Sequence, residues 1–491
     1  MLESTPFEIP VFRPVANPVA ENADVLVVGL TESGEFTPTL LAIDGLTGKW
    51  ISRLFELGQL RGKQGELSLL ASPVSDGPVM ILVVGLGNKP VTRSDAFELS
   101  ASAIRQLVDR KRDRVIVSLA ESFPEEFQEQ IVAGAVSACE VQALYQTDPP
   151  IEVPASIDFS GIGQAVIERG AVIGQAINQT RRLVNEPPAM VYPASFAERV
   201  EELAAGTELQ IEVWDEKKLE AEGCRSILAV GAGSSKPPRL VIMRYPGGGN
   251  EAPLALVGKG VTFDSGGLSL KPSDAMVDMK CDMAGAATVV GVMLAAAKLG
   301  LRKNLIGLCG LAENMVSGDS YKLGDVIETR SGKTIEILNT DAEGRVVLAD
   351  TLDVAVQCEP QAIVDLATLT GACMVALGTD VVGMMTNDQP LCDAVRQAAD
   401  VQGEPVWQLP MFELYDEKVK SKVADIKNVG EGRWGGAITA AKFLENFVGD
   451  VPWLHLDIAG PAFAESPKSH RDAGATGVMV RTLLHWIEST D

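Results

Sequence analysis

Short apolar runs alternate with amphipathic helical stretches along most of this chain, and this alternation limits the folds open to it. In the first 150 residues the apolar runs lie at 24–30, 79–85 and 114–120. Helical spacing of apolar residues covers 95–113 and 125–144, between and after these runs. Strands that alternate with helices in this way form mainly parallel sheets covered by helices. The sequence therefore predicts an α/β fold.

A proline-rich stretch at 147–154 interrupts the alternation, which then resumes. Consecutive prolines fit neither a helix nor a central strand, so this stretch predicts a domain boundary. A long helical stretch over about 161–185 follows it. Beyond that helix, strands are expected near 209–213, 239–244, 253–263, 304–312 and 362–370, and helices near 195–205, 284–299, 343–356 and 437–447.

These boundaries predict three parts. Residues 1–155 form an N-terminal α/β domain with a mainly parallel sheet, and residues 156–190 form a linker helix. Residues 191–491 form a C-terminal α/β domain with a central mixed sheet flanked by helices. A length of 491 residues agrees with two or more domains.

Composition and charge narrow the possible partners and compartment. The formal net charge of -24 repels nucleic acid and anionic membranes, so we expect neither as a partner. The seven cysteines are widely spaced and include no CxxC pair, which predicts free thiols. The first residues lack a basic segment followed by an apolar core, and no run approaches 18 apolar residues. We therefore expect a cytoplasmic protein.

Two carboxylates and an arginine stand close together at Asp341, Glu343 and Arg345. They lie between a β-branched run at 334–337 and a helix-like stretch at 346–352. In open α/β sheets, such strand-to-helix junctions border the crevice in which ligands bind. Taken alone, however, the pattern is more typical of a helix cap at Asp341 followed by a first-turn acid at Glu343.

A second charged stretch upstream favours the ligand interpretation. Lys259 and Asp264 interrupt an apolar run that leads into a glycine-rich turn, and Asp282 follows 18 residues after Asp264. Buried charges without partners are costly, so these groups need partners. Together with Asp341 and Glu343 they form a set of hard ligands suited to divalent cations. For Lys259, a simple salt bridge to Asp264 remains an equally good alternative.

The octapeptide 339–346 resembles the signature of the leucyl aminopeptidase (cytosol aminopeptidase) family of two-metal aminopeptidases. The spacing of Lys259, Asp264 and Asp282 matches the same family. The resemblance is good over about 160–491 and only general over the first 150 residues. In the family the octapeptide usually ends in leucine, whereas this chain has Val346. We expect its side chain to face the core and to change packing without a loss of chemistry.

The resemblance implies a metal-dependent exopeptidase, a hydrolase that releases N-terminal amino acids from peptides and prefers leucine and other apolar residues. It also implies a cytoplasmic homohexamer whose residues 191–491 form the catalytic metallopeptidase domain. Each subunit would bind two divalent ions, manganese or zinc, and a hydroxide that bridges them would attack the peptide bond. The implied metal ligands are Lys259, Asp264, Asp282, Asp341 and Glu343.

The resemblance also assigns roles around the metals. Lys271 would stabilise the oxyanion, although by itself a solvated loop lysine is the more frequent situation. Arg345 would hold a bicarbonate that acts as the general base, unless it pairs with a nearby acid such as Asp350. The substrate side-chain pocket would be formed by Met279, Thr368 and Gly371.

Two other functions remain compatible with the sequence. Some members of the family act as DNA-binding regulatory proteins, but the strong negative charge argues against that function here. A two-metal phosphoesterase would use a similar set of ligands. Parallel assays on an aminoacyl anilide and a phosphate ester distinguish this last possibility from a peptidase.

Overall fold

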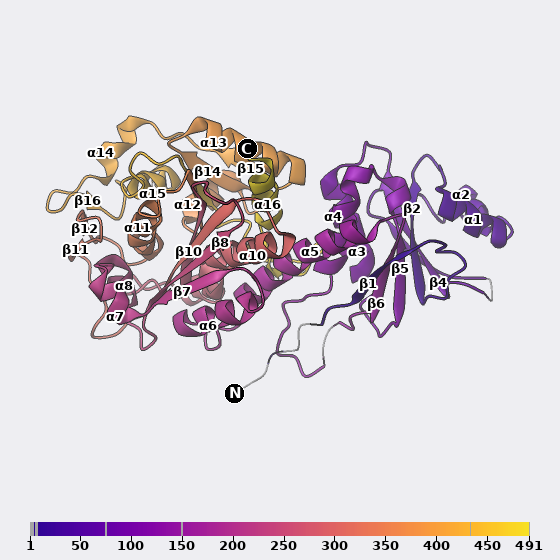
Figure 1. Ribbon diagram of the computed structural model, residues 1–491, viewed down its shortest axis with the longest axis horizontal. Helices are drawn as coiled ribbons and strands as arrows, with labels where there is room; N and C mark the ends of the chain where they lie inside the picture. The colour runs from indigo at the N-terminus through magenta and orange to yellow at the C-terminus, as the bar shows by residue number, and fades with distance from the viewer. Residues whose placement is uncertain (1–3, 5–7, 74–75, 149–150, 433, 491) are drawn as a thin grey trace. The chain divides into compact units, whose positions relative to one another are not determined.

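The computed structural model describes residues 4, 8–73, 76–148, 151–432 and 434–490. Contacts within the chain define two compact units, which are drawn in Figure 1. The first unit comprises residues 1–178 and 466–473, and the second comprises residues 179–465 and 474–491.

The first unit contains a six-stranded sheet that is parallel throughout except at the pair β3 and β4. The expected mainly parallel sheet is therefore confirmed. In sheet order its strands are β1 (Val11–Val15), β6 (Ser156–Ser160), β5 (Arg114–Ser118), β2 (Val25–Thr31), β4 (Met80–Gly87) and β3 (Leu67–Ala71). Its helices are α1 (Pro38–Leu46), α2 (Trp50–Glu56), α3 (Arg93–Arg105), η1 (Ala120–Ser122), η2 (Glu125–Phe127) and α4 (Gln128–Ser137).

Both faces of this sheet are buried, which explains why its strands read as continuous apolar runs. Successive side chains of a strand point to opposite faces. In β2, Val25 and Val27 belong to one core cluster, whereas Leu26 and Val28 belong to another. The first cluster also contains side chains of α3 and α4, and the second contains side chains of α1 and α2.

The contacts divide the chain later than the proline-rich stretch does. Pro149 and Pro150, at the centre of that stretch, lie outside the described residues. Beyond them, β6 returns to the first sheet and pairs with both β1 and β5. The division falls between residues 178 and 179, inside helix α5 (Gln164–Asn185). The first unit extends past residue 155 because hydrogen bonding within its sheet continues beyond the prolines.

The second unit contains an eight-stranded mixed sheet, as expected. Its central strands β17, β13, β9 and β10 run parallel to one another. In sheet order the strands are β15 (Val406–Gln408), β14 (Val382–Thr386), β17 (Trp453–Asp457), β13 (Ala362–Ala367), β9 (Leu254–Asp264), β10 (Asn304–Asn314), β8 (Arg239–Pro246) and β7 (Gln210–Trp214).

Helices and two small sheets surround this central sheet. The helices are α6 (Pro193–Ala204), α7 (Glu216–Ala221), α8 (Arg225–Gly231), α9 (Ser273–Met276), η3 (Met279–Met283), α10 (Ala284–Leu299), α11 (Glu343–Val356), α12 (Gly371–Leu377), α13 (Gln389–Gln402), η4 (Glu413–Tyr415), α14 (Asp416–Val419), α15 (Gly436–Glu445) and α16 (Val480–Ser489). One small sheet contains β11 (Val326–Glu328), β12 (Thr334–Glu336) and β16 (Ile426–Lys427), and the other contains β18 (Phe463–Ala464) and β19 (Gly474–Ala475).

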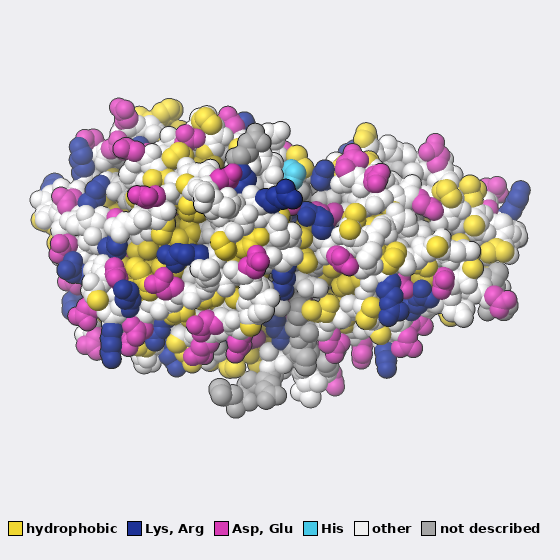
Figure 2. Space-filling view, viewed as in Figure 1, with side chains coloured by type: hydrophobic (Ala, Val, Ile, Leu, Met, Phe, Trp, Pro, Cys, Tyr) yellow, Lys and Arg dark blue, Asp and Glu magenta, His cyan; other side chains and the backbone are white. Residues whose placement is uncertain are grey.

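Three observations bear on the environment of the protein. The stretch 273–299 is long and apolar enough to cross a membrane, but 83% of its most apolar part is buried inside the structure. On the face shown in Figure 2, acidic and basic side chains are interspersed. All seven cysteines are free thiols, as expected.

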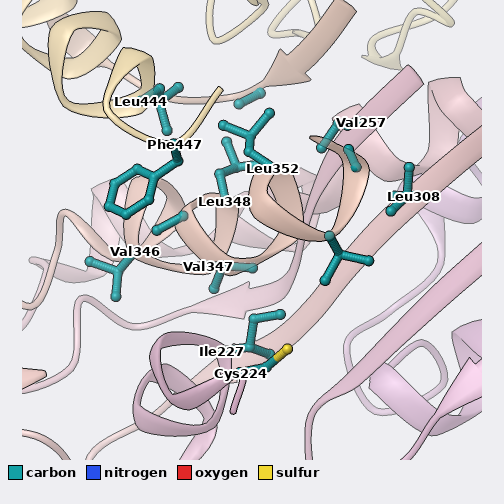
Figure 3. Close-up of a cluster of buried hydrophobic side chains, with 14 of the residues drawn as sticks. Cys224, Ile227, Val257, Leu308, Val346, Val347, Leu348, Leu352, Leu444 and Phe447 are labelled. Atoms are coloured by element: carbon teal, nitrogen blue, oxygen red, sulfur yellow. The ribbon is translucent and has the colours of Figure 1, made fainter. Parts of the chain in front are cut away.

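Helix α11 is fixed by apolar packing along most of its length. Figure 3 shows Val346, Leu348 and Leu352 of this helix among side chains from neighbouring elements, including Leu444 and Phe447. Val346 is completely buried in this cluster, so the expectation that it faces the core is confirmed. Because α11 begins at Glu343, this packing also fixes the position of a candidate ligand.

Candidate metal centre

The charged residues singled out in the sequence meet at the carboxyl end of β9. Lys259 lies within this strand, and Asp264 is its last residue. Asp282 lies in η3, Asp341 precedes α11, and Glu343 is the first residue of α11. The structure therefore brings the five residues of the expected ligand set to one place.

The strand-to-helix junction differs in one respect from the expected one. The strand before the octapeptide is β12, which belongs to the small three-stranded sheet and not to the central sheet. The octapeptide reaches the crevice because the Thr340 side chain is bonded to the turn that follows β9. Thr340 donates its hydroxyl to the Gly266 carbonyl at 2.7 Å and accepts from the Ser269 amide at 2.8 Å.

Three of the carboxylates are close enough to share a cation. Ligand oxygens of Asp264, Asp341 and Glu343 all lie within 4.8 Å of one another. The amine of Lys271 lies beside two of them, 2.8 Å from Asp264 Oδ2 and 2.6 Å from Asp341 Oδ1. Lys271 is therefore part of the cluster and not a solvated loop lysine.

Lys259 is buried among the remaining ligands. Its Nζ lies 2.7 Å from Asp282 Oδ1 and 2.8 Å from Glu343 Oε1, and it donates to the Thr368 carbonyl at 2.9 Å. Burial by itself lowers the pKa of this amine, but Asp282, Glu343 and Asp264 outweigh burial and hold the pKa above its ordinary value. The ion pairs of Lys259 are with Asp282 and Glu343, in place of the pair with Asp264 considered from the sequence.

The cluster holds more negative charge than its lysines neutralise. Burial raises the pKa of the carboxyl groups of Asp264, Asp282 and Asp341. Among the described residues, the buried oxygens Asp282 Oδ2 and Glu343 Oε2 have no hydrogen-bond partner. A buried acceptor without a donor is costly, and a bound cation removes that cost. The donor set therefore fits divalent metal ions.

Glycine is required at two positions where the chain passes close to the cluster. A Cβ atom at position 344 would lie 2.5 Å from Lys259 Cε and 2.6 Å from its Nζ. Gly266 has a φ of +84°, and a Cβ atom there would lie 2.9 Å from Asp341 Oδ1. These glycines leave room for the lysine and the carboxylates.

The sequence did not reveal Asn314 and Tyr321, which orient Asp264 and the backbone before Asp341 through hydrogen bonds. Asn314 Nδ2 donates to Asp264 Oδ1 at 2.8 Å and to the Thr340 carbonyl at 2.9 Å. The Tyr321 hydroxyl donates to the same carbonyl at 2.9 Å. Asn314 ends β10 and pairs in register with Asp264 at the end of β9. The only sequence signal for this role was that Asn314 is a polar residue just after the strand expected near 304–312.

Arg345 lies in the first turn of α11 and is largely buried. Its Nη1 donates to the Asn428 carbonyl at 2.9 Å, whereas its Nε has no partner among the described residues. Burial lowers the pKa of the guanidinium to about 10, and the carboxylates of Glu343 and Asp457 oppose this shift. Arg345 therefore remains a cation at neutral pH.

Asp350, considered from the sequence as a partner for Arg345, is occupied elsewhere. It accepts hydrogen bonds from the backbone amides of Ser226 at 2.7 Å, Ile227 at 3.3 Å and Arg330 at 2.8 Å. These bonds tie α8 and the segment after β11 to α11. The carboxylate of Asp350 is a structural group.

The three residues expected to line a substrate pocket occupy different positions. Met279 is half-buried and begins η3, the element that contains Asp282. The Thr368 hydroxyl donates to Asp282 Oδ1 at 2.7 Å and so contacts a candidate ligand directly. Gly371 is exposed at the start of α12, with open space where a side chain would lie.

Histidine takes no part in the candidate cluster of described residues. His455 is fully buried in β17, and its Nδ1 lies 2.6 Å from Asp365 Oδ1. Its ring stacks on Trp453, whose indole nitrogen bonds the same aspartate at 2.6 Å. This histidine packs within the central sheet.

Sequence comparisons give a consistent result over nearly the whole chain. The cytosol aminopeptidase family matches with its N-terminal domain over residues 27–149 and its catalytic domain over residues 178–484. A probable cytosol aminopeptidase from Rhodopirellula baltica is 64% identical over 481 residues, covering 96% of this chain and 95% of that one. A probable cytosol aminopeptidase from Geobacter sp. is 40% identical over 483 residues, covering 96% and 98%.

Solved structures with the same fold agree with these matches. A mutant of tomato leucine aminopeptidase superposes with a TM-score of 0.88 at 32% identity, covering 100% of this chain and 99% of that one. The bottromycin maturation enzyme BotP in complex with Mn superposes with a TM-score of 0.84 at 34% identity, covering 95% and 99%.

Proposed function

The chain belongs to the cytosol aminopeptidase family and is a metal-dependent aminopeptidase, and we propose that two divalent ions per subunit bind at the cluster at the end of β9. The observation that carries this proposal is the set of three carboxylates within 4.8 Å of one another, beside a buried lysine–aspartate pair. Two of the buried carboxylate oxygens have no donor among the described residues.

The five ligands divide naturally between two ions. The resemblance to the family implies that Asp264 and Glu343 would help to hold both ions and that Asp341 would complete the ligands of one ion. Asp282 and Lys259 would complete the ligands of the other. Lysine binds a metal only as a neutral amine, so binding must release the Lys259 proton. Manganese and zinc both suit such a site, and the similar BotP has been seen with Mn.

Bound metal ions supply Lewis acidity, which polarises a carbonyl group and lowers the pKa of water. The chain's own residues then determine which bond is placed there. The Lys271 amine lies beside Asp264 and Asp341, and 16% of its side chain is accessible. From that position it can donate to the oxygen that gains negative charge when a peptide carbonyl is attacked.

A general base is the remaining requirement, because the carboxylates near the reaction centre are all assigned as ligands. Arg345 is a buried cation, and its Nε has no partner among the described residues. We infer that it binds a small anion beside Glu343. Bicarbonate fits this position and would supply a base at neutral pH.

The proposed substrates are peptides with a free N-terminus and a leucine-like first residue. Docking of the α-amine against Asp282 would restrict cleavage to the first peptide bond. Met279, Thr368 and Gly371 are the proposed contacts of the first side chain. The flexible thioether of Met279 suits branched and unbranched aliphatic groups.

We propose a cytoplasmic location and a homohexamer. Resemblance to the family supports both proposals, and the free cysteines agree with the first. Closed symmetric assemblies are common among large enzymes of the cytoplasm. Light scattering at the assay concentration tests the assembly, and an active monomer would contradict it.

The function is tested by removing the metals and restoring them one at a time. The stripped enzyme should be inactive on leucyl anilide and should recover as Mn²⁺ or Zn²⁺ is added, up to two ions per subunit. Charged and aromatic aminoacyl anilides measure side-chain preference in the same experiment. A phosphate ester and duplex DNA serve as controls, and the family match favours neither as a ligand. Recovery with a single ion would contradict the two-metal assignment.

A further inference from the structure

The segment that joins β13 to α12 holds one side of the candidate metal centre. Its first residue, Thr368, contacts two candidate ligands at once. The Thr368 carbonyl accepts from Lys259 Nζ at 2.9 Å, and the Thr368 hydroxyl donates to Asp282 Oδ1 at 2.7 Å. The position of this segment therefore determines where Lys259 and Asp282 lie.

A buried carboxylate on the neighbouring strand holds this segment in place. Asp457 ends β17 and is completely buried. Its Oδ2 accepts from the Thr370 hydroxyl at 2.6 Å, and its Oδ1 accepts from the Leu369 amide at 3.3 Å and the Thr370 amide at 3.5 Å. The amide of Ala459 donates to the same oxygen at 3.1 Å. One carboxylate thus bonds two consecutive residues of the segment.

Thr370 connects this carboxylate to the following helix. Its hydroxyl accepts from the Cys373 amide at 3.0 Å and so caps the start of α12 while it donates to Asp457. Both hydrogen-bonding functions of the hydroxyl are used inside the protein. This one side chain therefore joins the turn between β13 and α12 to both β17 and the first turn of α12.

We propose that Thr370 and Asp457 form a clamp that positions Thr368 and thereby sets the geometry of the Lys259–Asp282 side of the metal centre. Both are positioning residues, since neither lies among the ligands. This inference rests on the proposed ligand assignment. It explains what holds two of those ligands, Lys259 and Asp282, in position.

The clamp acts only on the side of the metal centre formed by Lys259 and Asp282. Asp264 and the backbone before Asp341 are held by a separate set of bonds from Asn314 and Tyr321. Loosening the clamp should therefore weaken the ion at Lys259 and Asp282 and spare the ion at Asp341. Loss of groups that orient metal ligands typically lowers metal affinity by about 10–100-fold.

The test compares three threonine variants in the full-length enzyme. Thr370→Val removes the hydroxyl at nearly constant volume, whereas Thr370→Ser keeps it. Thr386→Val is the matched control: Thr386 is as buried as Thr370, 8% against 7% exposed. Its hydroxyl donates to the Trp453 carbonyl at 2.6 Å and accepts from the Asp388 amide at 3.0 Å. It thus bonds the opposite end of β17, away from the cluster.

Bound Mn²⁺ per subunit is measured at graded free Mn²⁺, together with the melting temperature of the stripped proteins. Thr370→Val should bind one ion about 10–100-fold more weakly and the other normally. Thr370→Ser should restore both affinities, and Thr386→Val should lose stability without losing metal. Two ions bound normally by Thr370→Val, or equal weakening by Thr386→Val, would overturn the clamp.

Two further variants keep the result interpretable. If Thr370→Val does not fold, Asp457→Asn can replace it, because it removes the charge that holds the Thr370 hydroxyl. Asp457→Asn should weaken binding of the ion at Lys259 and Asp282, and unchanged metal binding by this variant would overturn the clamp. Asp282→Asn tests the ligand assignment itself. If Asp282→Asn retains two ions at normal affinity, the assignment is wrong. If Asp282→Asn loses an ion and Thr370→Val does not, only the clamp is refuted.

Discussion

Replacement of Gly344 by alanine has two opposite effects on the free energy of unfolding: a gain in helix propensity and a displacement of Lys259. Within a helix, glycine is less favourable than alanine by about 1 kcal/mol, so the substitution would ordinarily stabilise α11. Here the new methyl group would lie 2.5–2.7 Å from three atoms of the Lys259 side chain. Non-bonded carbon atoms normally lie about 3.5–4.0 Å apart, so the lysine must move by about 1 Å.

That movement separates Lys259 from Asp282 and Glu343, which it now meets at 2.7 and 2.8 Å. Removing one partner of a buried ion pair costs about 3–5 kcal/mol, and stretching both ion pairs of Lys259 at once costs an amount of this order. After the helix gain is subtracted, Gly344→Ala should destabilise the metal-free protein by about 2–4 kcal/mol. A misplacement of about 1 Å at a reacting site lowers turnover by about 100-fold.

Urea unfolding of the stripped protein and kcat/KM with saturating Mn²⁺ measure the two effects. Gly45→Ala is the control, because Gly45 lies in α1 with nothing within 4 Å of a built Cβ atom. The control should gain up to about 1 kcal/mol and retain full activity. If Gly344→Ala is as stable and as active as the control, the close approach of Lys259 to this helix does not matter, and the reasoning fails.

Three further substitutions test separate parts of the site. Glu343→Gln removes charge at nearly constant volume and should lower metal affinity by more than the 10–100-fold of an outer-shell change, measured as metal retained after dialysis. Arg345→Ala should lower kcat by about 10²–10⁴-fold with both ions bound, and added bicarbonate should stimulate only the carbonate-depleted wild type. Val346→Leu adds a methylene to a closed core and should cost about 1–3 kcal/mol in urea unfolding at unchanged kcat/KM. Normal metal binding by the first, metal loss by the second or lost activity in the third would contradict these assignments.

Local patterns predicted the elements that build the site. Helices α10 and α11 begin and end where the sequence predicted, at 284–299 and 343–356. Apolar spacing marks a helix within a single window of the chain, and in α11 the carboxylate of Glu343 marks the first turn. The same reasoning predicted that Val346 is buried, since it lies on the apolar side of α11.

Features that depend on pairing between distant segments could not be predicted in this way. Asn314 bonds Asp264 because β10 and β9 pair in a particular register, and the two residues are 50 positions apart. The placement of β12 in a separate sheet and the return of β6 to the first sheet have the same origin. Register is set by packing across the whole sheet, and no local pattern encodes it.

The eight residues that complete the first unit, 466–473, have a consequence for how this protein is made. Asp472 lies 2.5 Å from Arg105 and accepts from the Gln142 amide at 2.9 Å, and Ser469 bonds Ser102 at 3.0 Å. On the ribosome, roughly 290 residues separate Asn178 from this segment, which at about 5–20 residues per second is a delay of roughly 15–60 s. During that interval Arg105 lacks its ion pair with Asp472. Completion of the first unit is therefore a late event in synthesis, and a chain that stops before residue 472 leaves its earliest-made part unfinished.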